Sequence, residues 1–387
     1  MVNFPASRLA GIAPFHVMEL LARAKALEAE GRDIIHMEVG EPDFPTPAPI
    51  VAAAQAQIAS GRIFYTPGLG LPALRQAIAG FYRQRYGVTV PAERVVVTAG
   101  ASAALLLAMA CLCSPGSEWL LSDPGYPCNA NFVRSFEGVP VAVRVRAEDN
   151  FQPTLAAITE HWTERSAGVL LASPANPTGT LLDERTLSAI AGFVRRQGGQ
   201  LIVDEIYHGL TYDCDASTAL SCGDDLMIVQ SFSKYFNMTG WRLGWLIAPE
   251  GRVRDIEKLA QNLYISPSTP AQYAALAAFT PETIAILEER RDAFRRRRDF
   301  LAPALQALGF RITAKPDGAF YLYADCRQLC ADSARFADEL LDSAGVAVTP
   351  GLDFGNNEPQ HHVRFAYTTD LARLAEAVER IRRFLGG

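Results

Sequence analysis

The residue types between positions 231 and 245 could carry out covalent chemistry. Ser231 and Ser233 precede a lysine, Lys234, and Arg242 follows eight residues later. Lysine is scarce in this chain, which has four lysines among its 36 Lys and Arg residues, so its use at this place needs a reason. A lysine amine that is partly desolvated and lies near another cation can form a Schiff base with an aldehyde. The pattern therefore predicts a nucleophilic amine at Lys234, with Arg242 as the neighbouring cation.

Further polar residues stand directly after short apolar runs, where strands are expected to end. These groups lie at 98–102, 175–179, 204–207 and 231–234. In an open parallel sheet, ligands bind beyond the carboxyl ends of the strands. We therefore expect one sheet edge to gather a lysine, an aspartate, a tyrosine, an asparagine, several hydroxyls and a turn of small residues that opens a helix.

The strands that must position these groups are visible as short apolar runs. They lie at 94–97, 119–121, 169–172, 201–203 and 227–230. Continuous runs of this kind suit a parallel sheet that is covered on both faces. Helical patterns at 102–112 and 184–196 separate some of them, which predicts an α/β sheet with right-handed crossovers. An antiparallel strand is expected at 241–248.

The C-terminal part of the chain has a different pattern. A long charged helix is expected from 281 through 298, and shorter elements follow it: strands at 318–324 and 362–366 and a helix at 371–385. This succession predicts a smaller α+β domain, against which an N-terminal helix at 17–30 is expected to pack.

The predicted group of residues meets the needs of pyridoxal phosphate. A carboxylate that keeps the ring nitrogen protonated makes the ring an electron sink, and Asp204, flanked by apolar residues, suits that task. Asn176 and Tyr207 can donate hydrogen bonds to the ring oxygen. The phosphate needs backbone amides at a helix start, hydroxyls and a forked cation. The candidates for it are Gly100, Ala101, Ser102, Ser231, Ser233 and Arg242.

These motifs resemble those of the fold-type I pyridoxal-phosphate enzymes, specifically the class I/II aminotransferases. The resemblance rests on the segments 39–44, 176–179, 204–207 and 231–245, and it extends from about residue 13 to the C-terminus. It implies an α/β fold with a mostly parallel central sheet covered by helices, together with a smaller α+β domain. We expect a large cofactor-binding domain at 46–284, and a small domain formed by 1–45 and 285–387.

The resemblance also implies roles for single residues. Lys234 would hold the cofactor as a Schiff base and then shuttle a proton as base and acid, with Asp204 and Tyr207 as its catalytic partners. Tyr126 would stack on the cofactor ring, and Asn176 would contact both cofactor and substrate. Gly40 would belong to the segment that closes over the substrate, and Arg364 would bind the substrate carboxylate. Tyr65 would reach the phosphate of a neighbouring subunit. The last role implies a homodimer with shared active sites.

The sequence departs from the family pattern in two places. The phosphate turn at 99–102 lacks the lysine or other polar residue that many relatives place there. No position can be matched to the arginine that binds an acidic substrate side chain, so the preferred amino donor stays open. Ile12, Phe15, Tyr264 and Ser266 are candidates for the side-chain pocket, and they favour neutral or aromatic donors.

The expected activity is transfer of an α-amino group between an L-amino acid and a 2-oxo acid. The same residues would also serve a pyridoxal-phosphate-dependent carbon–sulfur lyase or a related elimination enzyme. A cofactor-binding regulatory protein is a third hypothesis, but the aminotransferase pattern begins within about the first fifteen residues, where a DNA-binding segment would be expected.

Composition argues against other classes of function. The net charge of −6 does not favour nucleic acid or an anionic membrane as a partner, and no apolar stretch is long enough to span a bilayer. The seven cysteines show no Cys-x-x-Cys pair, and no metal-ligand spacing is visible, so we expect a cytoplasmic protein without a metal. His208 is interpreted as structural, as are Cys111 and Cys113.

Overall fold

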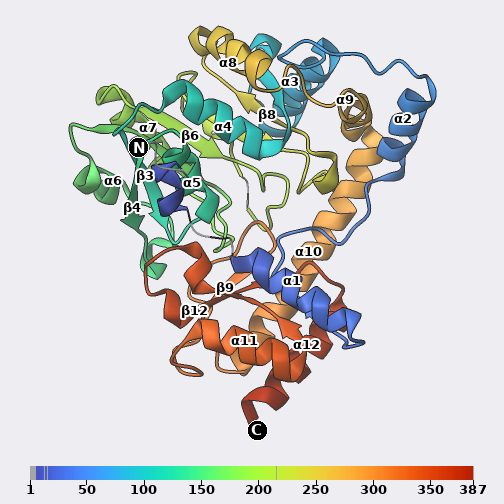
Figure 1. The fold of residues 1–387 in the computed structure, drawn as a ribbon, viewed down its shortest axis with the longest axis vertical. Coiled ribbons are helices and arrows are strands. Elements are labelled where there is room, and N and C mark those ends of the chain that lie inside the picture. Colours follow the sequence, from blue (N-terminus) through green and yellow to red (C-terminus); the bar gives the residue numbers. More distant parts are fainter. Residues whose placement is uncertain (1–5, 13, 15, 215, 387) are drawn as a thin grey trace.

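The computed structural model describes residues 6–12, 14, 16–214 and 216–386. Its largest feature is a seven-stranded sheet with the strand order β2-β8-β7-β6-β5-β3-β4 (Figure 1). The strands are β2 (Val95–Thr98), β3 (Glu118–Asp123), β4 (Val139–Arg144), β5 (Ser166–Ala172), β6 (Gln200–Asp204), β7 (Met227–Ser231) and β8 (Gly244–Ile247). Neighbouring strands are parallel from β7 to β4, whereas β8 runs antiparallel to both β7 and β2.

The apolar strand runs are buried on both sides because helices cover each face of this sheet. Successive strand residues point to opposite faces, so Val95 and Val97 pack into one hydrophobic cluster while Val96 packs into the other. One face is covered by α3 (Pro72–Tyr86), α6 (Leu155–His161) and α7 (Glu184–Arg196). The opposite face is covered by α4 (Gly100–Leu112), α5 (Pro127–Ser135) and α8 (Glu250–Leu263).

A smaller antiparallel sheet lies in the C-terminal part of the chain. Its strand order is β11-β12-β9, with β9 (Tyr321–Asp325), β11 (Thr349–Pro350) and β12 (His362–Ala366). The helices α11 (Ser333–Ala344) and α12 (Leu371–Gly386) accompany it, and the long helix α10 (Pro281–Ala307) runs between this part and the large sheet (Figure 1). The fold is therefore a mostly parallel, helix-covered sheet joined to a smaller sheet.

The N-terminal segment returns to the smaller sheet region. In α1 (His16–Ala29), Leu20 and Ala24 pack against Leu341 and Ala347. The two-residue strands β1 (Ile35–His36) and β10 (Val346–Ala347) pair in parallel. Two further helices, α2 (Ala48–Ala59) and α9 (Thr269–Leu276), pack against each other to the right of the large sheet in Figure 1. No helix in the described ranges combines the length and apolar character that crossing a bilayer requires.

Two departures from the elements expected from the sequence have a physical reason. The antiparallel strand expected at 241–248 begins only at Gly244, because residues Thr239–Trp241 form a 3-10 turn and Arg242 has a φ of 51°. The edge strand β4 was not expected: Pro140 interrupts its apolar run, and three of its six side chains are exposed.

Candidate active site

A cavity of about 260 Å³ opens at the carboxyl ends of β5, β6 and β7. The predicted site residues that line it are Gly40, Ala101, Ser102, Tyr126, Asn176, Asp204, Tyr207, Ser231, Ser233, Lys234, Arg242 and Arg364. They come from the sheet edge, the start of α4, strand β12 and the loop before α2. The sequence motifs, which are spread over more than 300 positions, therefore meet in one place.

Lys234 lies inside this cavity, three residues after β7 ends. Its Nζ donates a hydrogen bond to the carbonyl oxygen of Gly40 at 2.5 Å. Removal from water lowers the pKa of the Lys234 ammonium to about 8, and the positive charges of Arg364 and Arg242 act in the same direction, while Glu41 opposes them. A large fraction of this amine is therefore neutral, and so nucleophilic, near pH 8.

Asp204 is the last residue of β6 and is 5% exposed. Among the described residues, its carboxyl accepts one hydrogen bond, from the Ile206 amide at 3.0 Å. Burial raises the pKa of Asp204 to about 7, while the Ile206 amide and the Lys234 charge lower it. A buried carboxylate with so few donors is stable only when a cationic group faces it. The protonated ring nitrogen of pyridoxal phosphate fits this need.

The start of α4 forms a concave anion site with Arg242. Gly100 has a φ of +81°, and a Cβ at this position would lie 2.5 Å from Nη2 of Arg242, so only glycine fits. The hydroxyls of Ser231 and Ser233 are hydrogen-bonded to each other at 2.9 Å on the opposite wall. Free amides at the N-terminus of a 13-residue helix, an arginine and two hydroxyls match the chemistry of a phosphate group.

Arg364 is buried on β12 and faces the other end of the cavity. Its Nη1 donates to Oδ1 of Asn176 at 2.8 Å, and its Nη2 donates to the carbonyl of Glu38. Its Nε is buried and has no partner within the part of the chain that the structure describes. An unpaired guanidinium N–H needs an acceptor, and the carboxylate of an amino acid supplies one.

Tyr321, at the start of β9, is a site residue that the sequence analysis missed. Its hydroxyl lies 2.7 Å from the hydroxyl of Tyr207, and its ring centroid lies 4.4 Å from Cζ of Arg364. A Cβ on Gly40 would lie 1.9 Å from the Tyr321 hydroxyl oxygen. The only available signal was an aromatic residue in a predicted strand, which indicates a core position equally well.

Some predicted residues lie elsewhere. Tyr65 is 80% exposed and does not line the cavity of its own chain. Tyr264 and Ser266 do not line it either, nor does Ile12, while Phe15 lies outside the described residues.

From the same N-terminal region, Val17 and Met18 of α1 do line the cavity. His208 is 3% exposed, and its Nδ1 lies 3.5 Å from a Glu205 carboxylate oxygen. This buried contact fits a structural role for His208.

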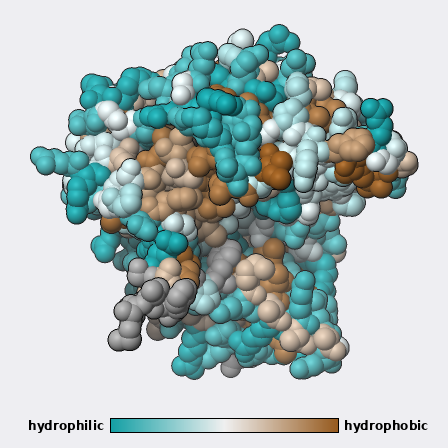
Figure 2. Space-filling view, turned by 45° about the horizontal axis from the view of Figure 1, so that its top comes forward, coloured by the Kyte–Doolittle hydropathy of each residue, from teal (hydrophilic) through white to brown (hydrophobic). Residues whose placement is uncertain are grey.

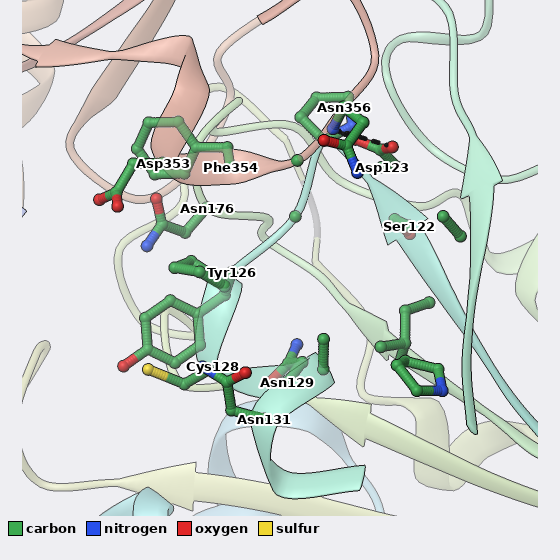
Figure 3. Close-up of a pocket in the computed structure, with 18 of the residues that line it drawn as sticks. Ser122, Asp123, Tyr126, Cys128, Asn129, Asn131, Asn176, Asp353, Phe354 and Asn356 are labelled. Atoms are coloured by element: carbon green, nitrogen blue, oxygen red, sulfur yellow. Dashed lines mark hydrogen bonds between the residues drawn. The ribbon is translucent and has the colours of Figure 1, made fainter. Parts of the chain in front are cut away.

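A second cavity, of about 370 Å³, adjoins the first and shares Tyr126 and Asn176 with it (Figure 3). Its other walls include Cys128 and Asn129 from α5, and Asp353 from the 3-10 turn Gly351–Phe354. Figure 3 shows Tyr126 standing between Cys128 and Asn176 along this wall.

Comparison with known proteins gives a consistent result. The family described as aminotransferase class I and II matches residues 32–381. The chain is 37% identical to valine–pyruvate aminotransferase of Mycobacterium tuberculosis over 97% of both chains. It is 35% identical to aspartate/prephenate aminotransferase of Thermus thermophilus over 98% of both chains.

Solved structures show the same relationship. An aminotransferase from Mycobacterium tuberculosis superimposes with a TM-score of 0.96, at 36% identity and with full coverage of both chains. Aspartate aminotransferase from Thermus thermophilus with maleate superimposes with a TM-score of 0.93, at 34% identity, covering 99% of this chain and 100% of that one. At 34–36% identity over the whole chain, the similarity supports membership of the same family as well as the same fold.

Proposed function

The chain belongs to the class I and II aminotransferases, and from this premise we propose that it binds pyridoxal phosphate covalently at Lys234 and uses it to move an α-amino group between an amino acid and a 2-oxo acid. The observation that carries the proposal is the pairing of a lysine whose pKa is about 8 with a buried, donor-poor aspartate in one cavity. The amine suits an aldehyde, and the carboxyl suits a ring cation.

The described residues can hold the cofactor at each of its polar groups. The amides at the start of α4, the hydroxyls of Ser231 and Ser233, and the Arg242 guanidinium would bind the phosphate. The contact between Tyr207 and Tyr321 supports a hydrogen bond from the Tyr207 hydroxyl to the ring oxygen, because Tyr321 holds that hydroxyl in position. Tyr126 lines the same cavity and would stack on the ring.

Catalysis then depends on what the side chains do with the substrate and its protons. Bound pyridoxal phosphate supplies an electron sink that acidifies the proton on the substrate Cα. Arg364 and Asn176 would hold the α-carboxylate, using the unpaired Nε of Arg364. The neutral Lys234 Nζ would take the proton from the substrate Cα and deliver it to C4′ of the cofactor, and the opposite half-reaction would use the reverse transfer. Asp204 would keep the ring nitrogen protonated by facing it with a negative charge.

Spectra with an amino donor alone test this proposal. An aminotransferase should convert its cofactor once to the amine form, whose absorbance appears and then stops until a 2-oxo acid is added. Continuous release of pyruvate and ammonia would instead identify an eliminating lyase. Borohydride reduction should fix the cofactor on the peptide that carries Lys234. Lys234→Ala should abolish this label, whereas Lys258→Ala is a matched control, because Lys258 is exposed and paired with Asp255.

We further propose a homodimer with shared active sites. Ile58, Ile63, Phe64 and Tyr65 are 46–80% exposed, which is unusual for a run of large apolar side chains. Figure 2 has a hydrophobic area on the side where α2 lies in Figure 1. A second copy that covers this region would bury the apolar surface and bring Tyr65 to the neighbour's phosphate. Sedimentation velocity measures this directly, and a monomer at micromolar concentration would contradict it.

The proposed division of the chain into 46–284 and into 1–45 with 285–387 is supported by the separation of the seven-stranded sheet from the three-stranded sheet. Residue 284 lies in the first turn of α10, so limited proteolysis would test this division by cleavage before Pro281. The cytoplasmic location stays a prediction, which rests on the cysteine usage.

A further inference from the structure

The second cavity lies beside the catalytic cavity, on the side of Tyr126 and Asn176. It shares Tyr126 and Asn176 with the catalytic cavity, and its volume of about 370 Å³ is sufficient for a side chain. If Arg364 and Asn176 hold the α-carboxylate, as proposed above, a substituent on Cα would reach this space beside Tyr126, which lines both cavities. The chemistry of its walls then decides which side chains are accepted.

Two buried side-chain oxygens at this cavity are hydrogen-bond acceptors without a partner among the described residues. Asp353 is 5% exposed: its Oδ1 accepts from the His16 amide at 3.1 Å, while its Oδ2 has no partner among the residues that the structure describes. Asn129 is 8% exposed, and within the same ranges its Oδ1 has no partner either. The side-chain amides of Asn129 and Asn176 also carry N–H groups at this wall. The unpartnered oxygens of Asp353 and Asn129 can accept from an incoming N–H or O–H group, whereas a carboxylate would meet the negative charge of Asp353.

Asp353 is also the dominant buried charge at this wall. Asp123 is closed off, since its carboxylate accepts the amides of Asn356 and Asn357. Arg134 is only half-buried and donates to Asn131. His16 also lines the cavity, and its side chain is 45% exposed and lies 3.4 Å from Glu19. Burial raises the pKa of the Tyr126 phenol and of the Cys128 thiol, which favours their neutral forms. Exposed charges are screened by water and salt, whereas a buried charge is screened much less.

The ionisation of Asp353 has opposing causes. Burial raises the pKa of Asp353, while the positive charge of Arg364 and the amides at the start of α1 lower it. The N-terminus of α1 therefore stabilises the negatively charged form of the Asp353 carboxyl. Its Oδ2 has no partner among the described residues and is left available to a ligand.

From this arrangement we infer that Asp353 sets the substrate class. The enzyme accepts amino donors with neutral side chains, favours those that carry a hydrogen-bond donor such as an amide, and discriminates against a second carboxylate. This inference rests on the proposed function, because it assumes that the two adjoining cavities hold one amino acid.

Two pairs of substrates isolate the effect, since each pair differs only in a terminal amide or carboxylate. For the wild-type enzyme, kcat/KM should be at least about tenfold higher for asparagine than for aspartate, and for glutamine than for glutamate, because like charges at close range are strongly unfavourable. Asp353→Asn removes the charge and keeps an acceptor for the His16 amide, so it should reduce this amide-to-carboxylate ratio by about tenfold. Asp353→Ser also removes the charge and offers a hydroxyl oxygen to the His16 amide, so it should reduce the amide-to-carboxylate ratio similarly.

Asp332→Asn is the matched control, because Asp332 caps α11 by accepting from the Ala334 amide at 2.8 Å in the same way, but lies outside both cavities. Its ratio should equal that of the wild type. The inference is overturned if the ratio is unchanged in both Asp353 variants, if none of the four amino acids reacts although others do, or if the wild type prefers aspartate and loses that preference in Arg134→Gln. Failure of every amino donor would instead refute the proposed function.

Discussion

Replacement of Gly40 by alanine tests whether the loop before α2, the lysine and the carboxylate-binding arginine form one rigid unit. The added Cβ would lie 1.9 Å from the hydroxyl oxygen of Tyr321 and 3.0 Å from its Cζ. Tyr321 cannot easily retreat, because it is 1% exposed, bonded to Tyr207 at 2.7 Å and covered by Arg364 at 4.4 Å. The loop must move instead, and with it the Gly40 carbonyl that holds Lys234.

The size of the effect follows from ordinary packing energies. Forcing an extra carbon into a packed site costs about 1–3 kcal/mol. If this cost is borne in the active arrangement, kcat/KM of Gly40→Ala should fall by about 5- to 150-fold. Tyr321→Phe loses one hydroxyl contact, which is worth about 1 kcal/mol, or about fivefold.

The double variant distinguishes a direct clash from two independent losses. Independent effects would multiply, whereas removal of the Tyr321 hydroxyl should relieve most of the conflict with the added methyl group, because the 1.9 Å contact disappears. We therefore expect Gly40→Ala with Tyr321→Phe to be no slower than Gly40→Ala alone. The assay is steady-state kcat/KM with one amino donor and 2-oxoglutarate, with melting temperatures as a check on folding.

Gly251→Ala serves as the control, since a Cβ at Gly251 would meet no described atom within 4 Å. A Gly40→Ala enzyme within about threefold of the wild type would refute the rigid-unit argument, because even the low end of the packing cost predicts a larger loss. So would a double variant whose loss equals the product of the two single losses.

Three further predictions concern ionisation and assembly. The rate at which apoenzyme takes up pyridoxal phosphate should rise with pH through about 8, where the Lys234 amine loses its proton, and a flat rate between pH 6.5 and 9 would contradict this. Asp204 has a folded-state pKa of about 7 against an ordinary 3.8, so its contribution to apoenzyme stability is lost as pH rises through about 7. Asp204→Asn should therefore remove a destabilisation on the order of 4 kcal/mol and raise the apoenzyme melting temperature more at pH 8 than at pH 5. The same variant should lose most of its activity. Tyr65→Phe should weaken pyridoxal phosphate binding about tenfold in equilibrium dialysis if its hydroxyl serves the neighbour's phosphate, and an unchanged Kd would argue against shared sites.

The fold was predictable wherever burial imposes a simple pattern on the sequence. Strands such as β6 and β7 are covered on both faces and therefore read as unbroken apolar runs. The half-exposed edge strand β4, whose apolar run contains Pro140, was missed. The expected strand at 241–248 was placed too early, because Arg242 adopts a left-handed conformation that brings its guanidinium beside Gly100. That requirement is tertiary and leaves no local trace.

The same distinction divides the candidate site. Lys234 and Asn176 stand directly after strands in recognisable motifs, so sequence and sheet topology together predicted that they would line one cavity. Tyr321 and Asp353 could not be found in this way. Tyr321 matters because β9 pairs with β12, which carries Arg364, and Asp353 matters because it meets the His16 amide from 337 positions away. Contacts of this range depend on how the smaller sheet docks, which no short pattern encodes.

The neighbours Asp204 and Glu205 illustrate what the structure adds to a motif. Both are buried, and burial raises the pKa of the first to about 7 and of the second to about 8. Glu205 is nevertheless satisfied by the protein, since it accepts from the Thr218 hydroxyl at 2.9 Å and from the Ala219 amide at 2.6 Å. Among the described residues, Asp204 receives a single amide, and it lines the cavity that contains Lys234. Successive strand residues point in opposite directions, so one carboxyl stabilises the fold while the other is left available to a cationic ligand.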